Sequence, residues 1–194
     1  MTTVNIIDLE STCWAERLPP EGQRSEIIEI GVASLDLDTL TVTAQAGLLI
    51  QPTTSEVSEF CTSLTTITPA LLATHGMPFP QACTQLRDQF SALERPWASW
   101  GQYDRKMLSA QTTALNLPLP VSTRHTNVKN AVVAALGFPK PLGMARALRH
   151  LGWTGTGTHH RGVDDAVNIA RIVAEAVRRQ PALRETLLSG TPQN

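Results

Sequence analysis

Near its start the chain reads Val4-Asn5-Ile6-Ile7-Asp8-Leu9-Glu10-Ser11-Thr12, an apolar run that ends in two carboxylates one residue apart. Side chains alternate along a β-strand, so we expect Asp8 and Glu10 on one face and Leu9 on the other. Two neighbouring carboxylates repel each other, and a cation that prefers hard oxygen ligands, Mg²⁺ or Mn²⁺, relieves that repulsion. The same pair also fits a strand that ends in a solvated turn, so this stretch alone leaves both interpretations open.

The composition indicates one domain. The chain has 194 residues, of which 42% are hydrophobic, and this is enough for a sizeable core. Its charge is uneven, because residues 1–60 carry ten acidic and two basic side chains, whereas the rest carry seven acidic and fourteen basic ones. An acidic metal site beside a phosphate-binding surface gives such a division, and so does ordinary surface charge.

The number and spacing of the cysteines indicate the cellular compartment. Cys13, Cys61 and Cys83 are far apart and show no zinc-ligand spacing, a pattern typical of a reduced, intracellular protein. No basic and then apolar leader opens the chain, and no apolar run is long enough to span a bilayer. We therefore expect a cytoplasmic protein with no membrane partner.

Local patterns predict three consecutive strands and then helices that alternate with short strands. Strands are expected at 4–12, 27–35, 40–50, 97–100 and 123–128. Helices are expected from Pro69, with Thr68 as N-cap, from Pro80, from near Asp104, and over 130–136, 143–151 and 163–177. We place a single domain at 1–180, followed by an accessory helix and tail at 181–194.

Two more acidic positions stand at the ends of predicted elements. Asp104 follows a short strand at the start of a helix, where a plain N-cap is the ordinary alternative. Asp165 lies in the first turn of the last helix, at the edge of its buried stripe, where a carboxylate needs a partner or a metal ion. A histidine, His160, comes five residues before Asp165, after a Gly/Thr-rich loop at 154–158.

Together these motifs resemble the DEDDh branch of the DnaQ-like 3′–5′ exonucleases, and within it the Eri1-type and KapD-like exoribonucleases. The resemblance covers about residues 4–177. It implies an α/β, RNase H-like fold in which helices flank a central mixed sheet. The matching stretches are Ile7-Asp8-Leu9-Glu10-Ser11-Thr12-Cys13-Trp14, Glu26-Ile27-Ile28-Glu29-Ile30-Gly31, Phe60-Cys61-Thr62-Ser63-Leu64-Thr65-Thr66-Ile67-Thr68, Trp100-Gly101-Gln102-Tyr103-Asp104 and residues 160–171.

The resemblance also implies a catalytic site. Two divalent metal ions, Mg²⁺ or Mn²⁺, would be bound by Asp8, Glu10, Asp104 and Asp165. His160 would act as the general base that takes a proton from the attacking water.

The motif that contains His160 has a second possible register, because His159 stands at the same distance before Asp164. We choose His160 with Asp165, since Asp165 is followed by Ala166 and then by 168–171 in the order of the family. His159 is then expected to be a solvated loop residue and Asp164 a helix-start acid.

The terminal nucleotide of the substrate is expected against Leu9, Ser11, Thr12, Cys13 and Trp14, with Tyr103 as a further candidate. In this hypothesis Thr12 hydrogen-bonds the 3′-hydroxyl, and Trp14 either stacks on a base or packs at the rim of the sheet. Some basic residues should also meet phosphates, but the sequence does not distinguish among Arg124, Lys129, Arg146, Arg149 and Arg161.

The predicted function is metal-dependent 3′–5′ exonuclease activity that releases nucleoside monophosphates from single-stranded RNA 3′ ends by two-metal hydrolysis. The alternatives are the same chemistry on single-stranded DNA and a non-catalytic nucleic-acid-binding regulatory module. A phosphatase of the haloacid-dehalogenase type fits less well, because such enzymes need Asp where this chain has Glu10. The sequence does not indicate a protein partner.

Overall fold

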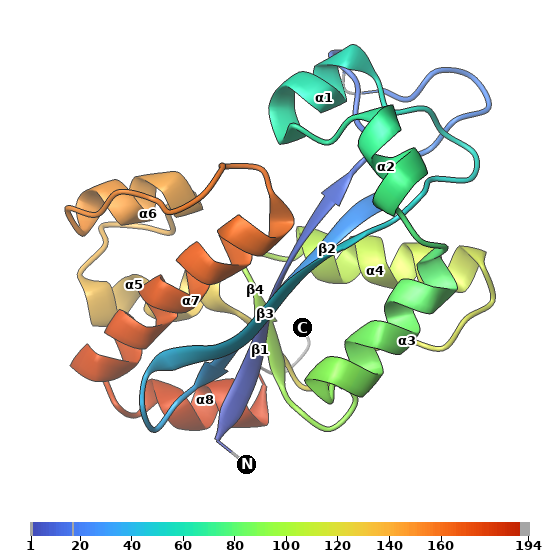
Figure 1. The fold of residues 1–194 in the computed structure, drawn as a ribbon. Coiled ribbons are helices and arrows are strands. Elements are labelled where there is room, and N and C mark those ends of the chain that lie inside the picture. Colours follow the sequence, from blue (N-terminus) through green and yellow to red (C-terminus); the bar gives the residue numbers. More distant parts are fainter. Residues whose placement is uncertain (1, 17, 191–194) are drawn as a thin grey trace.

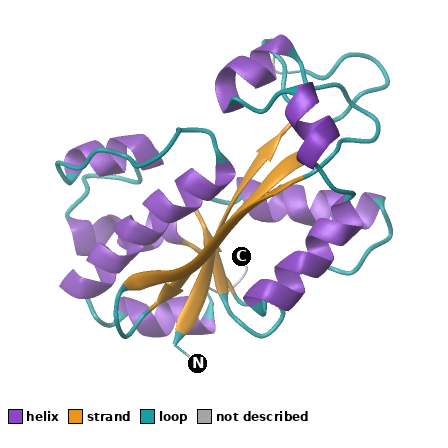
Figure 2. Ribbon diagram, in the orientation of Figure 1, coloured by secondary structure: helices purple, strands orange, loops and turns teal. Residues whose placement is uncertain are grey.

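A five-stranded mixed sheet lies between two groups of helices in the computed structural model, which describes residues 2–16 and 18–190 (Figures 1 and 2). The strands are β1 (Thr3–Ser11), β2 (Ile27–Asp36), β3 (Thr41–Leu49), β4 (Trp97–Ser99) and β5 (His125–Asn127), in the order β3-β2-β1-β4-β5. The first three strands pair antiparallel, whereas β4 runs parallel to both β1 and β5. All five predicted strands are therefore present, in a mixed sheet as expected.

Eight helices complete the described part of the chain. They are α1 (Glu59–Thr65), α2 (Pro69–His75), α3 (Phe79–Phe90), α4 (Tyr103–Ala114), α5 (Val128–Leu136), α6 (Met144–His150), α7 (Gly162–Arg179) and α8 (Leu183–Ser189). Helices α5, α6 and α7 lie on one side of the sheet, and α3 and α4 lie on the other (Figure 1). The predicted cap of α2 is confirmed, because the Thr68 hydroxyl accepts a hydrogen bond from the amide of Leu71.

The alternation of β1 divides its side chains between two cores. Val4 and Ile6 pack in the core beneath α5, α6 and α7, whereas Ile7 and Leu9 pack in the core beneath α3 and α4. Asp8 and Glu10 therefore point to the α7 side of the sheet.

The C-terminal helix α8 contributes Leu183 and Leu187 to the core on the α7 side, so it packs within the same folded unit. The tail predicted beyond it falls partly on residues 191–194, which lie outside the described residues. Within the described ranges, no helix has both the length and the apolar character needed to cross a membrane.

Two glycines let the first turn of α7 lie directly on the sheet. Gly31 of β2 pairs with Asp8 of β1, and a Cβ built on Gly31 would lie 1.8 Å from the carbonyl carbon of Gly162. A Cβ on Gly162 would in turn lie 2.9 Å from the carbonyl oxygen of Asp8. Only residues without side chains permit this approach, and it brings Asp165 of α7 to the end of β1.

Candidate active site

Three carboxylates from two elements converge at the end of β1. Asp8 and Glu10 come from the strand, Asp165 comes from the first turn of α7, and one oxygen of each lies within 4.8 Å of the others. Glu10 and Asp165 are buried, and Asp8 is partly exposed. Three of the four acids predicted from the sequence to bind metal therefore lie together.

The fourth predicted acid, Asp104, stands beside this cluster and outside the group of three. It is buried in the first turn of α4, and its Oδ1 accepts a hydrogen bond of 3.0 Å from the amide of Leu9. This bond links α4 to the residue that lies between Asp8 and Glu10. Asp104 is close enough that its charge is the second-largest cause of the pKa shift of Asp8.

The protonation of the cluster reflects burial and mutual repulsion. Burial, followed by the charges of Asp104 and Glu10, raises the pKa of Asp8 well above its usual range. Burial, followed by the charges of Asp165 and Glu29, raises the pKa of Glu10 to about 9. Burial also raises the pKa of Asp104 to about 6, although the hydrogen bond from Leu9 opposes this shift.

This set of donors fits a divalent cation. Carboxylate oxygens are the ligands that Mg²⁺ and Mn²⁺ prefer, and buried carboxylates that raise one another's pKa lack the positive charge that would let them all ionise. The three acids of the group would be the direct ligands of such a cation, and Asp104 stands beside them at the start of α4.

Glu29 is a fully buried acid next to the cluster, and the sequence had suggested no role for it. It pairs with Glu10 across the sheet, and its Oε2 accepts hydrogen bonds from Nε of Arg161 at 3.1 Å and from the amide of Gly162 at 2.9 Å. The guanidinium of Arg161 is thus paired with Glu29, and the two hydrogen bonds to Glu29 fix the start of α7. The signal in the sequence was a charged residue inside the apolar run of β2, which requires a buried partner.

The two histidines before α7 both reach the acidic cluster. Nδ1 of His160 lies 4.0 Å from Oε1 of Glu10, and its backbone amide donates a 3.0 Å hydrogen bond to Oδ2 of Asp165. The backbone of His160 is left-handed, with φ of 65°. Burial, and then the neighbouring His159, lower the pKa of His160 below its usual value, so the ring is mainly neutral at neutral pH.

His159 is a solvent-exposed loop residue, as expected, but it also contacts the acidic cluster. About half of its side chain is exposed, but Nδ1 lies 3.0 Å from Oδ2 of Asp165, and its ring stacks on that of His160 with centroids 4.0 Å apart. Asp164 points instead into the preceding loop, where it accepts a hydrogen bond from the amide of Thr158. The left-handed turn at His160 accounts for the difference, because it folds both rings toward the same carboxylate.

The residues expected to meet the terminal nucleotide divide into two groups. Ser11 and Tyr103 lie at the rim, where their hydroxyls are 2.7 Å apart and the tyrosine is 55% exposed. Trp14 and Cys13 are partly exposed on the segment that leaves β1. Burial and the nearby Cys61 raise the pKa of the Cys13 thiol to about 12, so this thiol stays protonated.

Leu9 and Thr12 have internal contacts instead. The Leu9 side chain packs beneath α3 and α4, because strand alternation turns it away from Asp8 and Glu10. The Thr12 hydroxyl is fully buried, where it accepts a hydrogen bond from the amide of Glu26 and donates one to the carbonyl of Arg24. We therefore assign Thr12 the shaping of this turn, in place of the expected bond to a 3′-hydroxyl.

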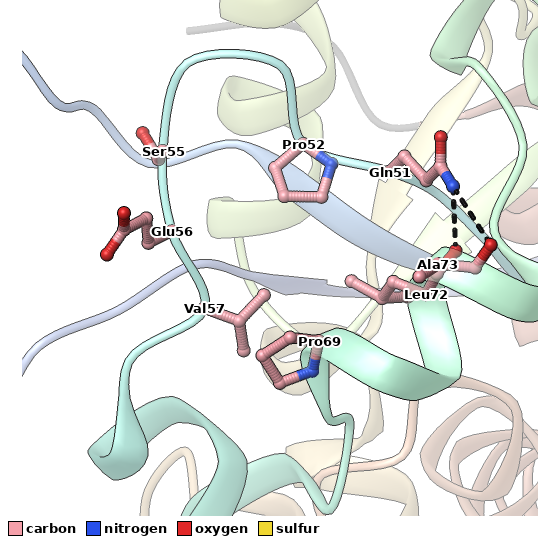
Figure 3. A pocket seen from close by; sticks show the side chains of 8 residues that line it. All are labelled: Gln51, Pro52, Ser55, Glu56, Val57, Pro69, Leu72 and Ala73. Atoms are coloured by element: carbon pink, nitrogen blue, oxygen red, sulfur yellow. Dashed lines mark hydrogen bonds between the residues drawn. The ribbon is translucent and has the colours of Figure 1, made fainter.

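A separate hollow of about 470 Å³ lies between residues 51–57 and α2 (Figure 3). The Gln51 amide spans one side of it and donates hydrogen bonds to the carbonyls of Leu72 and Ala73. Five of its eight lining residues are apolar, and Glu56 is its one titratable side chain. It therefore offers none of the chemistry found at the end of β1.

The raised pKa values predict how stability depends on pH. In chelator, the melting temperature should fall as pH rises from about 5 to 9, because Glu10 is protonated in the folded state up to about 9 but ionises near 4.5 when unfolded. The stabilisation is complete below the unfolded pKa and is lost as pH approaches the folded one.

Glu10→Gln should flatten this pH profile, and Glu56→Gln, at an exposed position, should leave it unchanged. Differential scanning calorimetry across this range measures both slopes. A profile that is equally steep in Glu10→Gln would contradict the assignment of the proton to Glu10.

Comparison with known sequences places this geometry among nucleases. The sequence model of the RNase T family, described as exonuclease, matches residues 6–173. The chain is 27% identical to the 3′-5′ exonuclease Snipper of Drosophila melanogaster, over 89% of this chain and 68% of that protein. It is 28% identical to human ERI1 exoribonuclease 3, over 93% of this chain and 55% of the relative. It is 25% identical to the probable 3′-5′ exonuclease KapD of Bacillus subtilis, over 86% of this chain and 80% of the relative.

Solved structures agree with the sequence comparison. The nuclease domain of 3′hExo, described as a DEDDh family member bound to rAMP, superposes with a TM-score of 0.81 at 25% identity, over 100% of this chain and 97% of that one. A 3′-exonuclease structure described by its 3′-end-specific recognition of a histone mRNA stem-loop gives 0.81 at 27% identity, over 92% and 83%. The RNase H-like fold expected from the sequence is thereby confirmed.

Proposed function

The chain belongs to the RNase T exonuclease family, in its DEDDh branch, and from this premise we propose that it is a metal-dependent 3′–5′ exonuclease that hydrolyses RNA from the 3′ end. The observation that carries the proposal is the convergence of Asp8, Glu10 and Asp165 within 4.8 Å, with Asp104 and His160 beside them. Burial and mutual repulsion raise the pKa values of Asp8 and Glu10, and a bound cation would relieve that repulsion.

Mg²⁺ or Mn²⁺ bound by these acids would supply positive charge against the scissile phosphate and lower the pKa of the attacking water. Our proposal follows the family in taking two such ions. The remaining chemistry belongs to the side chains of the protein.

His160 is the general base. Its lowered pKa leaves the imidazole neutral at pH 7, so it can accept the proton of the attacking water. Its backbone amide is hydrogen-bonded to Asp165, so the position of the base is coupled to the position of one acid of the cluster. His159 is less suited to this role, because its Nδ1 already contacts the carboxylate of Asp165.

The rim beside α4 holds the terminal nucleotide. Tyr103 presents an exposed ring at the end of β1, and its hydroxyl is fixed by Ser11. An aromatic face there can stack on any of the four bases. Trp14 is a second candidate for this contact from the segment after β1.

RNA is the substrate that the relatives favour, since several of those similar along most of this chain are named exoribonucleases. The chain spans only about half the length of human exoribonuclease 3, so the substrate of that protein supports this proposal without deciding it. Single-stranded DNA is the competing substrate of the same chemistry.

A gel time course tests the proposal. 5′-labelled single-stranded RNA and DNA of one sequence would be incubated with Mg²⁺, with Mn²⁺ and with chelator. We expect a ladder that shortens from the 3′ end of RNA, faster than for DNA, and is abolished by chelator. Equal rates on both strands would remove the RNA assignment, and intact strands under every metal condition would overturn the exonuclease itself.

A further inference from the structure

The structure shows which of the arginines considered as phosphate contacts already have partners within the protein. Arg161 is bound to Glu29, and Arg124 donates hydrogen bonds to the carbonyls of Leu188 and Glu94. Arg146 and Arg149 of α6 are exposed, and within the described ranges their guanidinium groups have no hydrogen bond or ion pair. Being three residues apart on a helix, they share one face.

These two arginines line hollows that lead to the acidic cluster. One hollow, of about 350 Å³, has Met144, Leu148 and Trp153 as its apolar wall, and Arg149, His159 and Asp165 also line it. An adjoining hollow of about 400 Å³ is lined by Arg146 and shares Met144, Arg149 and His159 with the first. Together they extend from Asp165 to the free arginines.

Hydrogen bonds to α7 hold the loop that forms the outer wall. The Asn168 side chain bonds both the amide and the carbonyl of Thr156, at 3.0 and 2.9 Å. Arg171 donates to the carbonyl of Thr154 and lies 5.4 Å from the ring centroid of Trp153. The apolar wall is therefore in place without a ligand, and this lowers the entropy cost of binding.

The position of these hollows relates them to the reaction. Tyr103 and Ser11 lie on the α4 side of the cluster, whereas α6 lies on the α7 side of the sheet (Figure 1). An exonuclease that cuts the last linkage holds the terminal nucleotide on one side of the scissile phosphate and the penultimate nucleotide on the other.

We propose that the hollow between α6 and residues 153–157 binds the penultimate nucleotide of the substrate strand. Its base lies against Met144, Leu148 and Trp153, and Arg146 and Arg149 bind the phosphodiester on its 5′ side. Guanidinium groups suit this contact, because they donate paired hydrogen bonds to phosphate oxygens. The inference rests on the proposed exonuclease function and adds a second subsite to it.

Two substrates separate the subsites. Single-stranded RNA fills both, whereas the 4-nitrophenyl ester of uridine 5′-phosphate carries only the terminal nucleotide. For the double variant Arg146→Ala with Arg149→Ala, we expect kcat/KM to fall at least about tenfold more on RNA than on the ester, mainly through KM. The salt dependence of RNA binding should also become shallower.

Arg178→Ala is the matched control, because it removes one exposed arginine that lies about 20 Å along α7 from Asp165. A second measurement uses the wild-type protein alone, so it does not depend on the folding of a variant. An abasic residue at the penultimate position of the RNA should slow hydrolysis about tenfold, and one a further residue upstream should have a smaller effect.

The outcomes are distinguishable. Equal losses on RNA and on the ester, or an abasic penultimate residue without effect, would overturn the second subsite while wild-type activity still supports the exonuclease. A wild-type protein that hydrolyses neither substrate with Mg²⁺ or Mn²⁺ would overturn the exonuclease and the subsite together.

Discussion

Asp8→Asn is expected to lower kcat/KM on single-stranded RNA by at least about a thousandfold. Charge stabilisation by bound metal is worth several kcal/mol in such reactions, and each 1.36 kcal/mol is about tenfold in rate. Asn keeps the shape of Asp8 but removes the charge at the centre of the cluster. Steady-state rates at saturating Mn²⁺ measure the loss, and titration calorimetry should detect weaker Mn²⁺ binding in the same variant.

The fold should tolerate this change. Asp8 is destabilised in its ionised form by burial and by Asp104 and Glu10, so in chelator the variant should melt at the same temperature as wild type or higher. Asp164→Asn is the matched control, because Asp164 bonds the loop at Thr158 and stands apart from the cluster. An Asp8→Asn variant that retains wild-type rates, or an Asp164→Asn variant that loses as much, would contradict the site as described.

Features that depend on local sequence patterns, such as strand alternation, the apolar stripe of a helix and a helix cap, could be predicted from the sequence. Alternation along β1 places Asp8 and Glu10 together, and the apolar stripe of α7 places Asp165 at the edge of the core. Thr68 before Pro69 marks the start of α2. Each of these signals is contained within a few residues, so neighbouring segments do not alter it.

Features that depend on contacts between distant segments could not be predicted in the same way. Glu29 and Arg161 are 132 positions apart, and nothing local indicates that each neutralises the other. His159 contacts Asp165 because His160 adopts a left-handed backbone, and the identity of residue 160 as histidine does not predict that conformation. Likewise, the free guanidinium groups of Arg146 and Arg149 differ from those of Arg124 and Arg161 only in what surrounds them.

The close approach of α7 to the sheet gives the second large effect. Gly31→Ala is expected to destabilise the folded protein by more than about 3 kcal/mol, because overpacking that meets backbone cannot be relieved by a change of rotamer. The added Cβ would lie 1.8 Å from the carbonyl carbon of Gly162, 2.0 Å from its oxygen and 2.3 Å from the amide nitrogen of Val163. Urea unfolding at constant pH measures the difference.

Gly143→Ala provides the matched control, because a Cβ there would meet no atom within 4 Å and its φ of −65° suits alanine. As an N-cap substitution it should cost about 1 kcal/mol or less. Equal stabilities of the two variants would show that α7 can withdraw from β2 freely. We expect instead that any Gly31→Ala protein that folds has α7 displaced, with Asp165 farther from Asp8. A displacement of about 1 Å at a catalytic group costs on the order of a hundredfold in rate, so this variant should also lose activity.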